Sequence, residues 1–287
     1  MPQTPSPLRY PGGKTAIWPM ISKIISSNGL SKGHYAEPYA GGGGLALSLL
    51  LRGYVHELHL NDLDPSIWAF WDSILNKKDD FIQLVRETPI TIDEWKKQRD
   101  VQENKFEADP LELGFSSFFL NRTNRSGVIQ KAGVIGGLAQ SGKYKIDCRF
   151  NREGLVEKIN RISEYRHRIH LYNMDAIQFI KATRTALPNK TLYCIDPPYF
   201  VKGSTLYTNF YEPKDHAEIA RLLNRLGKPW LLTYDNSPEI QKLYPERRQF
   251  NFNLNYSAAD KKVGTELLIV SDKIDIPADL NINKVAV

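Results

Sequence analysis

Residues 35–62 read YAEPYAGGGGLALSLLLRGYVHELHLND, and this stretch decides the fold class. A short strand at 35–37 leads into a glycine-rich turn, and the apolar run Leu45–Leu51 is expected to form a helix. A second strand at 56–60 follows and ends close to Asp62. Strand, glycine turn, helix, strand and acid form the first half of a nucleotide-binding α/β sheet.

The α/β alternation stops after a predicted helix at 65–75 and resumes near residue 151. Between them lie charged helical segments and a basic, glycine-rich stretch that we expect to form loops or short strands. The later predicted elements are helices at 152–165, 175–182 and 213–226, strands at 168–172, 192–195 and 230–234, and an antiparallel pair at 250–254 and 267–270. We therefore expect one α/β Rossmann-like sheet with helices on both faces. Residues 1–75 and 151–287 would form this domain, and 76–150 a mainly helical, loop-rich insertion.

Positive charge is concentrated in two segments of the chain. The formal net charge is +6, and neither 1–35 nor 121–145 contains an acidic residue, although both carry several Lys and Arg residues. Concentrated positive charge is typical of a protein that binds a polyanion such as nucleic acid. A basic face that is merely solvated is the alternative.

The bulk composition favours a cytoplasmic protein. Its two cysteines, Cys148 and Cys194, are far apart in the sequence, which fits a reducing compartment and argues against a disulfide framework or cysteine-ligated zinc. No run of 18 apolar residues occurs, so no membrane partner is expected. The start of the chain lacks the apolar region of a signal peptide.

The tetrapeptide Asp196-Pro197-Pro198-Tyr199 follows the predicted strand at 192–195. It suits chemistry on an exocyclic amino group, because a carboxylate accepts hydrogen bonds without donating any. Pro197 stiffens the turn and can present its carbonyl as a second acceptor. Tyr199 offers a flat ring on which a base can stack. A strand-ending turn with a packed tyrosine is the alternative.

The glycine turn suits an adenosine ligand that carries a positive charge. Residues 40–44 lack the Gly-x-Gly-x-x-Gly spacing of dinucleotide-binding turns. Glu37 would repel a pyrophosphate there but would attract a cation, and Asp62 can bind ribose hydroxyls. S-adenosylmethionine has these properties. A tight structural turn and a helix-capping Asp62 are the alternatives.

Taken together, these motifs resemble a known family. They are Tyr10-Pro11-Gly12-Gly13-Lys14, Glu37-Pro38-Tyr39-Ala40-Gly41-Gly42-Gly43, Asn61-Asp62, Asn121-Arg122-Thr123-Asn124-Arg125-Ser126-Gly127, Arg149-Phe150-Asn151 and Asp196-Pro197-Pro198-Tyr199. Their order over residues 7–271 is similar to that of the Dam-type (D12 class) DNA adenine-N6 methyltransferases. The resemblance implies a methyltransferase sheet whose insertion recognises the DNA target.

The resemblance also implies roles for individual residues. The expected catalytic residues are Asp196, Pro197, Pro198 and Tyr199. The expected cofactor-binding residues are Tyr10, Lys14, Glu37, Tyr39, Ala40, Gly41, Gly43, Asp62, Asp175 and Asp196. Asp175 has an equally good alternative role as the N-cap of the next helix.

For DNA contact the candidates are Arg122, Asn124, Arg125 and Lys131, because Arg suits guanine edges and Asn suits adenine edges. A phosphate contact or a solvated loop is the alternative for each, and Asn121 is expected to be structural. The segment 126–145 differs from that of family members that read GATC, so the target sequence is left open.

The predicted function is transfer of a methyl group from S-adenosylmethionine to N6 of a flipped-out adenine in double-stranded DNA. Alternatives are a cytosine-N4 methyltransferase, in which Ser often replaces the motif's Asp, a catalytically inactive DNA-binding relative, and a nucleotide-dependent oxidoreductase. We expect no metal cofactor, a monomer, and a bacterial or phage origin. A cognate restriction endonuclease acting on the same site would be a further partner.

Overall fold

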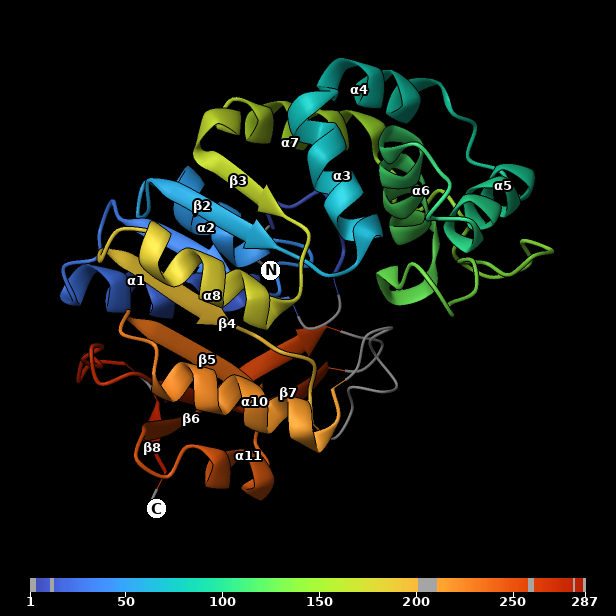
Figure 1. Ribbon diagram of the computed structural model, residues 1–287. Coiled ribbons are helices and arrows are strands. Elements are labelled where there is room, and N and C mark those ends of the chain that lie inside the picture. The colour runs from blue at the N-terminus through green and yellow to red at the C-terminus, as the bar shows by residue number, and fades with distance from the viewer. Residues whose placement is uncertain (1–3, 11–12, 201–210, 258–260, 281, 286–287) are drawn as a thin grey trace.

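One mixed β-sheet forms the centre of the protein (Figure 1). The structure, a computed structural model, describes residues 4–10, 13–200, 211–257, 261–280 and 282–285, so Pro11 and Gly12 lie outside it. The strands are β1 His34–Glu37, β2 Glu57–Asn61, β3 Ile169–Tyr172, β4 Thr191–Ile195, β5 Trp230–Asp235, β6 Arg248–Ser257, β7 Lys261–Val270 and β8 Asn283–Lys284. Their order is β3-β2-β1-β4-β5-β7-β6-β8. The first five are parallel, and β7 is antiparallel to both β5 and β6. The predicted α/β sheet is confirmed.

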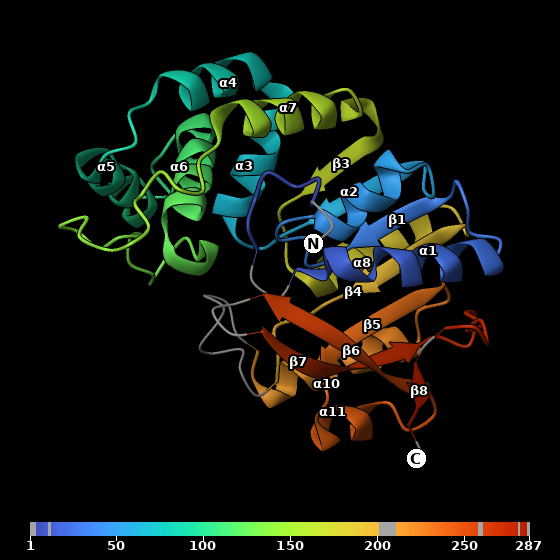
Figure 2. The same cartoon turned by 180° about the vertical axis from the view of Figure 1, so that it is seen from behind.

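Helices cover both faces of the sheet, as a doubly wound fold requires (Figures 1 and 2). The helices on one face are α1 Trp18–Ser27, which follows the short η1 Lys14–Ile17, and α2 Gly44–Leu51. Those on the other face are α8 Ala176–Ala186, α10 Pro213–Asn224 and α11 Pro238–Leu243. Successive strand residues belong to different apolar clusters, with Tyr35 in one and Ala36 in the other, because side chains alternate across a strand.

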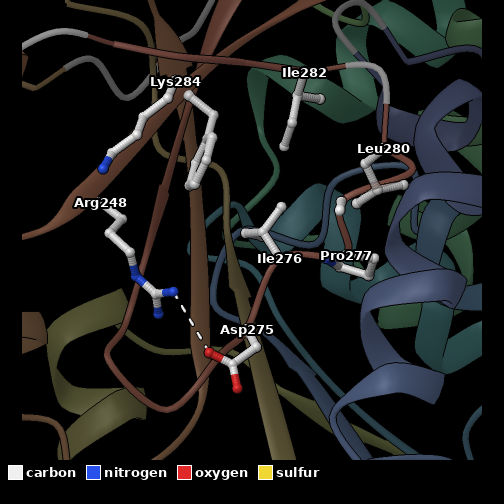
Figure 3. A pocket seen from close by; sticks show the side chains of 9 residues that line it. Arg248, Asp275, Ile276, Pro277, Leu280, Ile282 and Lys284 are labelled. Carbon is white, nitrogen blue, oxygen red and sulfur yellow. Dashed lines mark ion pairs between the residues drawn. The ribbon is translucent and has the colours of Figure 1, made fainter.

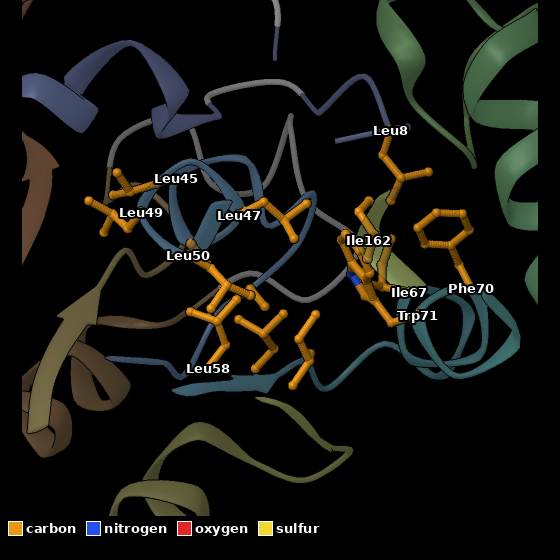
Figure 4. Close-up of a cluster of buried hydrophobic side chains, with 14 of the residues drawn as sticks. Leu8, Leu45, Leu47, Leu49, Leu50, Leu58, Ile67, Phe70, Trp71 and Ile162 are labelled. Carbon is orange, nitrogen blue, oxygen red and sulfur yellow. The ribbon is translucent and has the colours of Figure 1, made fainter. Parts of the chain in front are cut away.

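The predicted helix after the glycine turn is α2, and it is buried on all sides (Figure 4). Its leucines pack among residues of α1, the sheet and α3, in one cluster that includes Leu58 and Trp71. A helix that is apolar all round has no face to present to water and is therefore a core helix. This packing fixes where the glycine turn lies.

The insertion is helical and shares its core with the rest of the protein. Its helices are α4 Lys78–Glu87, α5 Ile92–Glu103 and α6 Pro110–Thr123, and they pack beside α3 Pro65–Asn76 and α7 Arg152–Ser163. Phe118 of α6 stacks on Phe70 of α3 at 6.0 Å and meets Phe81 of α4 at 5.4 Å and Phe150 at 5.4 Å, measured between ring centroids. The predicted boundaries at 76 and 150 therefore fall inside one continuous apolar cluster.

The C-terminal part completes the sheet. The predicted antiparallel pair is confirmed, with Phe250 opposite Leu268, but β7 rather than β6 lies next to β5. Beyond β6, a surface pocket of about 270 Å³ lies between β8 and the tail, where Arg248 faces Asp275 (Figure 3). It is at the opposite end of the sheet from β2 and is lined mainly by apolar tail residues, so we assign it no role. No helix in the described ranges is long and apolar enough to cross a membrane.

Candidate active site

The carboxyl ends of the parallel strands bring a row of polar side chains to one edge of the sheet. Because β1, β4 and β5 run in parallel, Glu37, Asp196 and Thr233 lie at or near the same edge. Antiparallel β7 brings Glu266 opposite Asp235. The strand alternation places Glu37, Asp196, Thr233 and Glu266 on the face that α1 and α2 cover.

Asp196 is held by one of its two carboxylate oxygens. Its Oδ1 accepts a hydrogen bond from the Thr233 hydroxyl at 2.7 Å and lies 3.1 Å from the Lys14 ammonium. The structure records no donor on Oδ2 among the described residues, and the side chain is 26 % exposed. The carboxylate is therefore oriented through Oδ1, and its other oxygen can accept hydrogen bonds from a ligand.

Lys14 lies inside this cluster, and its side chain is only 5 % exposed. Its ammonium reaches Glu266 at 3.3 Å and the Tyr199 hydroxyl at 3.2 Å, in addition to Asp196. Lys14 is predicted to bind the cofactor, and in the structure it lies next to two of the predicted catalytic residues, Asp196 and Tyr199. Buried charges are tolerated when they are paired in this way.

Tyr199 is buried, and its hydroxyl donates to Glu266 Oε1 at 2.7 Å. The Lys14 ammonium lies 5.2 Å from the centre of its ring. Thr233 and Glu266 were missed by the sequence analysis, because neither belongs to a recognisable motif. The one available signal for Glu266 was an acid within the apolar alternation of the last long strand.

The glycine turn is shaped around Tyr10. Gly41 and Gly43 have φ angles of 46° and 57°, in the left-handed region that favours glycine. A Cβ on Gly41 would lie 2.6 Å from the Tyr10 ring, and one on Gly43 would lie 2.9 Å from Trp71. The turn therefore needs glycine for its backbone conformation and for the close approach of Tyr10, while Ala40 is buried.

Asp62 connects the end of β2 to the glycine turn. Its two oxygens accept backbone hydrogen bonds, Oδ2 from Gly41 at 2.8 Å and Oδ1 from Asp64 at 3.0 Å. Burial raises the pKa of Asp62 to about 6, although these hydrogen bonds oppose the rise. Each oxygen keeps a lone pair with which it can accept a ligand hydroxyl.

Glu37 is a buried acid at the end of β1. Its Oε1 accepts a hydrogen bond from the Tyr35 hydroxyl at 2.8 Å. Burial raises the pKa of Glu37 to about 8, and the neighbouring negative charge of Asp196 adds to the rise. Such a carboxyl is suited to a cationic ligand, since a nearby positive charge would stabilise its ionised form.

The other predicted cofactor residues have contacts of their own. Asp175 caps α8, accepting from the backbone N–H groups of Ile177 at 2.9 Å and Gln178 at 3.2 Å. This is the alternative role that its sequence position suggested, and it is compatible with a ligand contact. The Tyr39 hydroxyl lies 2.7 Å from that of Tyr211.

The predicted DNA-contact residues divide into two groups. Asn124 is fully buried: its Oδ1 accepts from the Trp95 indole at 2.7 Å and its Nδ2 donates to Val128 and Ile129 carbonyls. Arg122 is also buried and donates to the Pro7 carbonyl. Asn124 therefore connects α5 to the loop after α6, and Arg122 connects α6 to the N-terminal segment. A DNA contact for either residue stays a prediction.

Arg125 and Lys131, by contrast, are exposed. The loop that carries them is held by buried Asn side chains and by the backbone hydrogen bond from Arg125 to the Gly133 carbonyl at 3.0 Å. The same loop exposes two apolar side chains, Leu138 at 64 % and Tyr144 at 59 %. In the described part of the chain, no group of His, Cys, Asp and Glu side chains is arranged to hold a metal ion.

Comparison with known proteins identifies the family of this chain. A family model described as D12 class N6 adenine-specific DNA methyltransferase matches residues 10–259. The Type II methyltransferase M.MjaIII of Methanocaldococcus jannaschii is 22 % identical over 241 residues, which are 77 % of this chain and 80 % of that protein.

Two solved structures match this chain at low sequence identity and with TM-scores below 0.5. One is PH1948 of Pyrococcus horikoshii, provisionally described as an RNA methyltransferase, with 11 % identity, a TM-score of 0.41, and coverage of 97 % of this chain and 88 % of that one. The other is the precorrin 8w decarboxylase of Methanobacterium thermoautotrophicum, with 10 % identity, a TM-score of 0.33 and coverage of 88 % of each chain.

Proposed function

Because the chain belongs to the D12 class of N6 adenine-specific DNA methyltransferases, we propose that its sheet edge binds S-adenosylmethionine beside an adenine that has left the DNA duplex. When bound, this cofactor supplies an electrophilic methyl group on a sulfonium. The observation that carries the proposal is the Asp196 carboxylate, which is held through Oδ1 by Lys14 and Thr233. Its second oxygen, Oδ2, would then accept a hydrogen bond from the adenine N6 amine.

The residues around the glycine turn fit this cofactor. Asp62 would accept hydrogen bonds from the ribose hydroxyls, since each of its oxygens retains a lone pair. Glu37 would face the positively charged sulfonium of the cofactor. The turn Ala40–Gly43 and Tyr10 would line the site between Glu37 and Asp62. The buried acid Glu37 would disfavour a phosphate at this turn and favour a cation, because an ionised carboxylate repels the first and attracts the second.

Asp196 and the Pro197 carbonyl would accept the two N6 hydrogens. The N6 lone pair is delocalised into the adenine ring, so two acceptors that hold both hydrogens favour a more tetrahedral nitrogen with its lone pair directed at the methyl group. Positioning of this kind can lower the activation free energy by about 7–11 kcal/mol. Positive charge would develop on N6 as its bond to the methyl carbon forms and the methyl–sulfur bond breaks. The Asp196 carboxylate would stabilise this charge and can take up the proton that N6 sheds.

The adenine would reach Asp196 only outside the double helix, because N6 is paired inside it. Tyr199 would then stack on the extruded base, with a contribution of about 1–3 kcal/mol. The hydrogen bond from its hydroxyl to Glu266 holds the ring in one orientation. A fixed stacking face lowers the ordering cost of binding the base.

Binding of the cofactor should depend on pH through Glu37. With its pKa near 8, this carboxyl is protonated in the free protein below that pH. A sulfonium favours the carboxylate, so binding releases a proton and affinity rises with pH until the free group is ionised. We expect the affinity for S-adenosylmethionine, relative to the uncharged S-adenosylhomocysteine, to rise by about threefold to tenfold per pH unit between about pH 6.5 and pH 8.

Calorimetric titration with both ligands measures this ratio. The comparison cancels the titration of Asp62, whose ribose contact is common to both molecules. Glu37→Gln should remove the difference in pH dependence. The same trend for both ligands in the unaltered protein would rule out a Glu37–sulfonium interaction.

The exposed loop cations should contribute to DNA affinity. Each Lys or Arg that neutralises a phosphate releases a counterion, so Arg125→Ala with Lys131→Ala should weaken DNA binding and reduce the slope of log K against log salt by about 2. Lys242→Ala, an exposed change on α11 away from the insertion, is the control (Figure 1). Equal salt slopes for the double variant and the control would exclude these two residues from the DNA surface.

The direct test of the proposed function uses methyl-labelled S-adenosylmethionine, purified protein and unmethylated genomic DNA. Mass spectrometry of the digested nucleosides identifies the modified base, and sequencing locates it. Labelled N6-methyladenine at one short motif is the expected result. Labelled N4-methylcytosine, or unlabelled DNA despite cofactor binding, would overturn it.

A further inference from the structure

Glu266 is a buried carboxylate on β7 that faces the edge where Asp196 lies. Its exposed fraction is 1 %, and it stands opposite Asp235 of β5 in the antiparallel ladder. An unpaired charge at such a position would cost several kcal/mol. The structure supplies partners: the Tyr199 hydroxyl at 2.7 Å and the Lys14 ammonium at 3.3 Å.

These contacts connect Glu266 to both groups that would hold the adenine. Through Lys14 it is linked to Asp196, because the same ammonium lies 3.1 Å from Asp196 Oδ1. It also holds the Tyr199 hydroxyl directly, and that hydroxyl lies 3.2 Å from the ammonium. An ammonium has three N–H groups, which here point among three acceptors, two on the turn 196–199 and one on β7.

We propose that Glu266 is a positioning residue for methyl transfer, holding Lys14 and Tyr199 so that the Asp196 carboxylate and the stacking ring are in place before adenine arrives. The inference rests on the proposed roles of Asp196 and Tyr199. Glu266 itself is enclosed and would touch neither the base nor the cofactor. It acts through groups that do, as a supporting residue must to keep a site within its productive geometry.

Loss of the Glu266 charge would change both partners. Without the Glu266 carboxylate, the Lys14 ammonium would pair more strongly with Asp196. The Asp196 carboxylate would then be a weaker acceptor for the N6 hydrogens. The Tyr199 hydroxyl would lose its anionic acceptor, and the ring would gain freedom to rotate. Small displacements of this kind can reduce a rate by up to about 100-fold.

The test is Glu266→Gln, which preserves shape and removes charge. We expect the single-turnover methylation rate, with DNA and cofactor saturating, to fall about tenfold, while their dissociation constants change by less than about threefold. Glu57→Gln is the matched control: this strand carboxylate lies on the other face of the sheet, 2.7 Å from His170, and should leave the rate unchanged.

The pH–rate profile distinguishes positioning from mere structural support. Burial raises the pKa of Glu266, with Asp196 adding to the rise and Lys14 opposing it; Tyr199 and Asp235 also face this group. As pH falls, protonation of Glu266 should weaken its ion pair with Lys14, let Lys14 pair more strongly with Asp196, and lower the rate. In Glu266→Gln this part of the acid limb should be absent.

A second variant tests the same link if Glu266→Gln does not fold. Tyr199→Phe keeps the stacking ring and removes the hydroxyl, and we expect a lower rate with unchanged cofactor binding. Where both variants fold, their combined effect should be smaller than the product of the single effects, because they break one connected set of contacts. The proposal would be overturned if the effects of the two substitutions simply multiply in the double variant. It would also be overturned if either folded variant has a rate within about twofold of the unaltered protein.

Asp196→Ala separates this inference from the proposed function. If it abolishes transfer while Glu266→Gln has no effect, only the positioning role fails. If neither variant loses activity, the site assignment on which both proposals rest fails.

Discussion

Asp196→Ala is expected to lower the rate of methyl transfer by about 10³-fold or more while leaving the protein folded. The substitution removes the acceptor that orients N6 and the negative charge that stabilises the developing cation. Asp196→Asn should be nearly as damaging. Its amide oxygen would take the place of Oδ1, which accepts from Thr233 and Lys14, so its NH₂ group would face the hydrogens of the adenine amine.

Incorporation of labelled methyl groups into DNA measures the loss, and thermal unfolding checks the fold. Asp79→Ala on α4 is a suitable control, because that side chain is 91 % exposed and α4 lies far from β4 and β5 in Figure 1. Near-normal turnover of a folded Asp196→Ala protein would refute the assignment of the catalytic carboxylate.

The largest stability effect is expected from Phe118→Ala in α6. This ring is fully buried and contacts the rings of Phe70 in α3, Phe81 in α4 and Phe150 just before α7, so its removal leaves a cavity among three other segments. Deletion of a buried phenylalanine ring costs about 3–5 kcal/mol. Because the insertion shares this cluster with α3, the whole protein should unfold at lower denaturant in one transition.

Phe106→Ala is the matched control within the insertion, since Phe106 is 86 % exposed, and its unfolding curve should not change. Unfolding followed by tryptophan fluorescence and by circular dichroism tests cooperativity. If Phe118→Ala instead produces two transitions, with the sheet unaffected, the insertion is an independent domain with boundaries near 76 and 150.

The local order of elements followed from the sequence with few errors. The expected strand at 192–195 and helix at 213–226 correspond to β4 Thr191–Ile195 and α10 Pro213–Asn224. These elements were readable because apolar periodicity, Pro at helix starts and glycine turns act over a few residues. The short helix α11 Pro238–Leu243 was not predicted, as six residues are too few for a periodic pattern.

The insertion shows where local sequence patterns are insufficient. Asn124 and Arg122 carry donor groups that suit base edges, and they stand in a basic segment, yet the structure buries both. Residue type and local charge say which contacts a side chain can make, but not the direction in which it points. That direction followed from Trp95 and the Pro7 carbonyl, which belong to distant segments.

By itself, the sequence determined the α/β class, the family and the motif residues Lys14, Asp62 and Asp196, because each rests on short-range patterns and on a motif order that runs along the chain. Only the tertiary structure decided that Lys14 meets Glu266, 252 residues away, and that Thr233 and Lys14 share one oxygen of Asp196. The physical reason is the pairing of β7 with β5, which no local pattern specifies. Burial then selects the contacts at the edge, since each charge removed from water must have a partner.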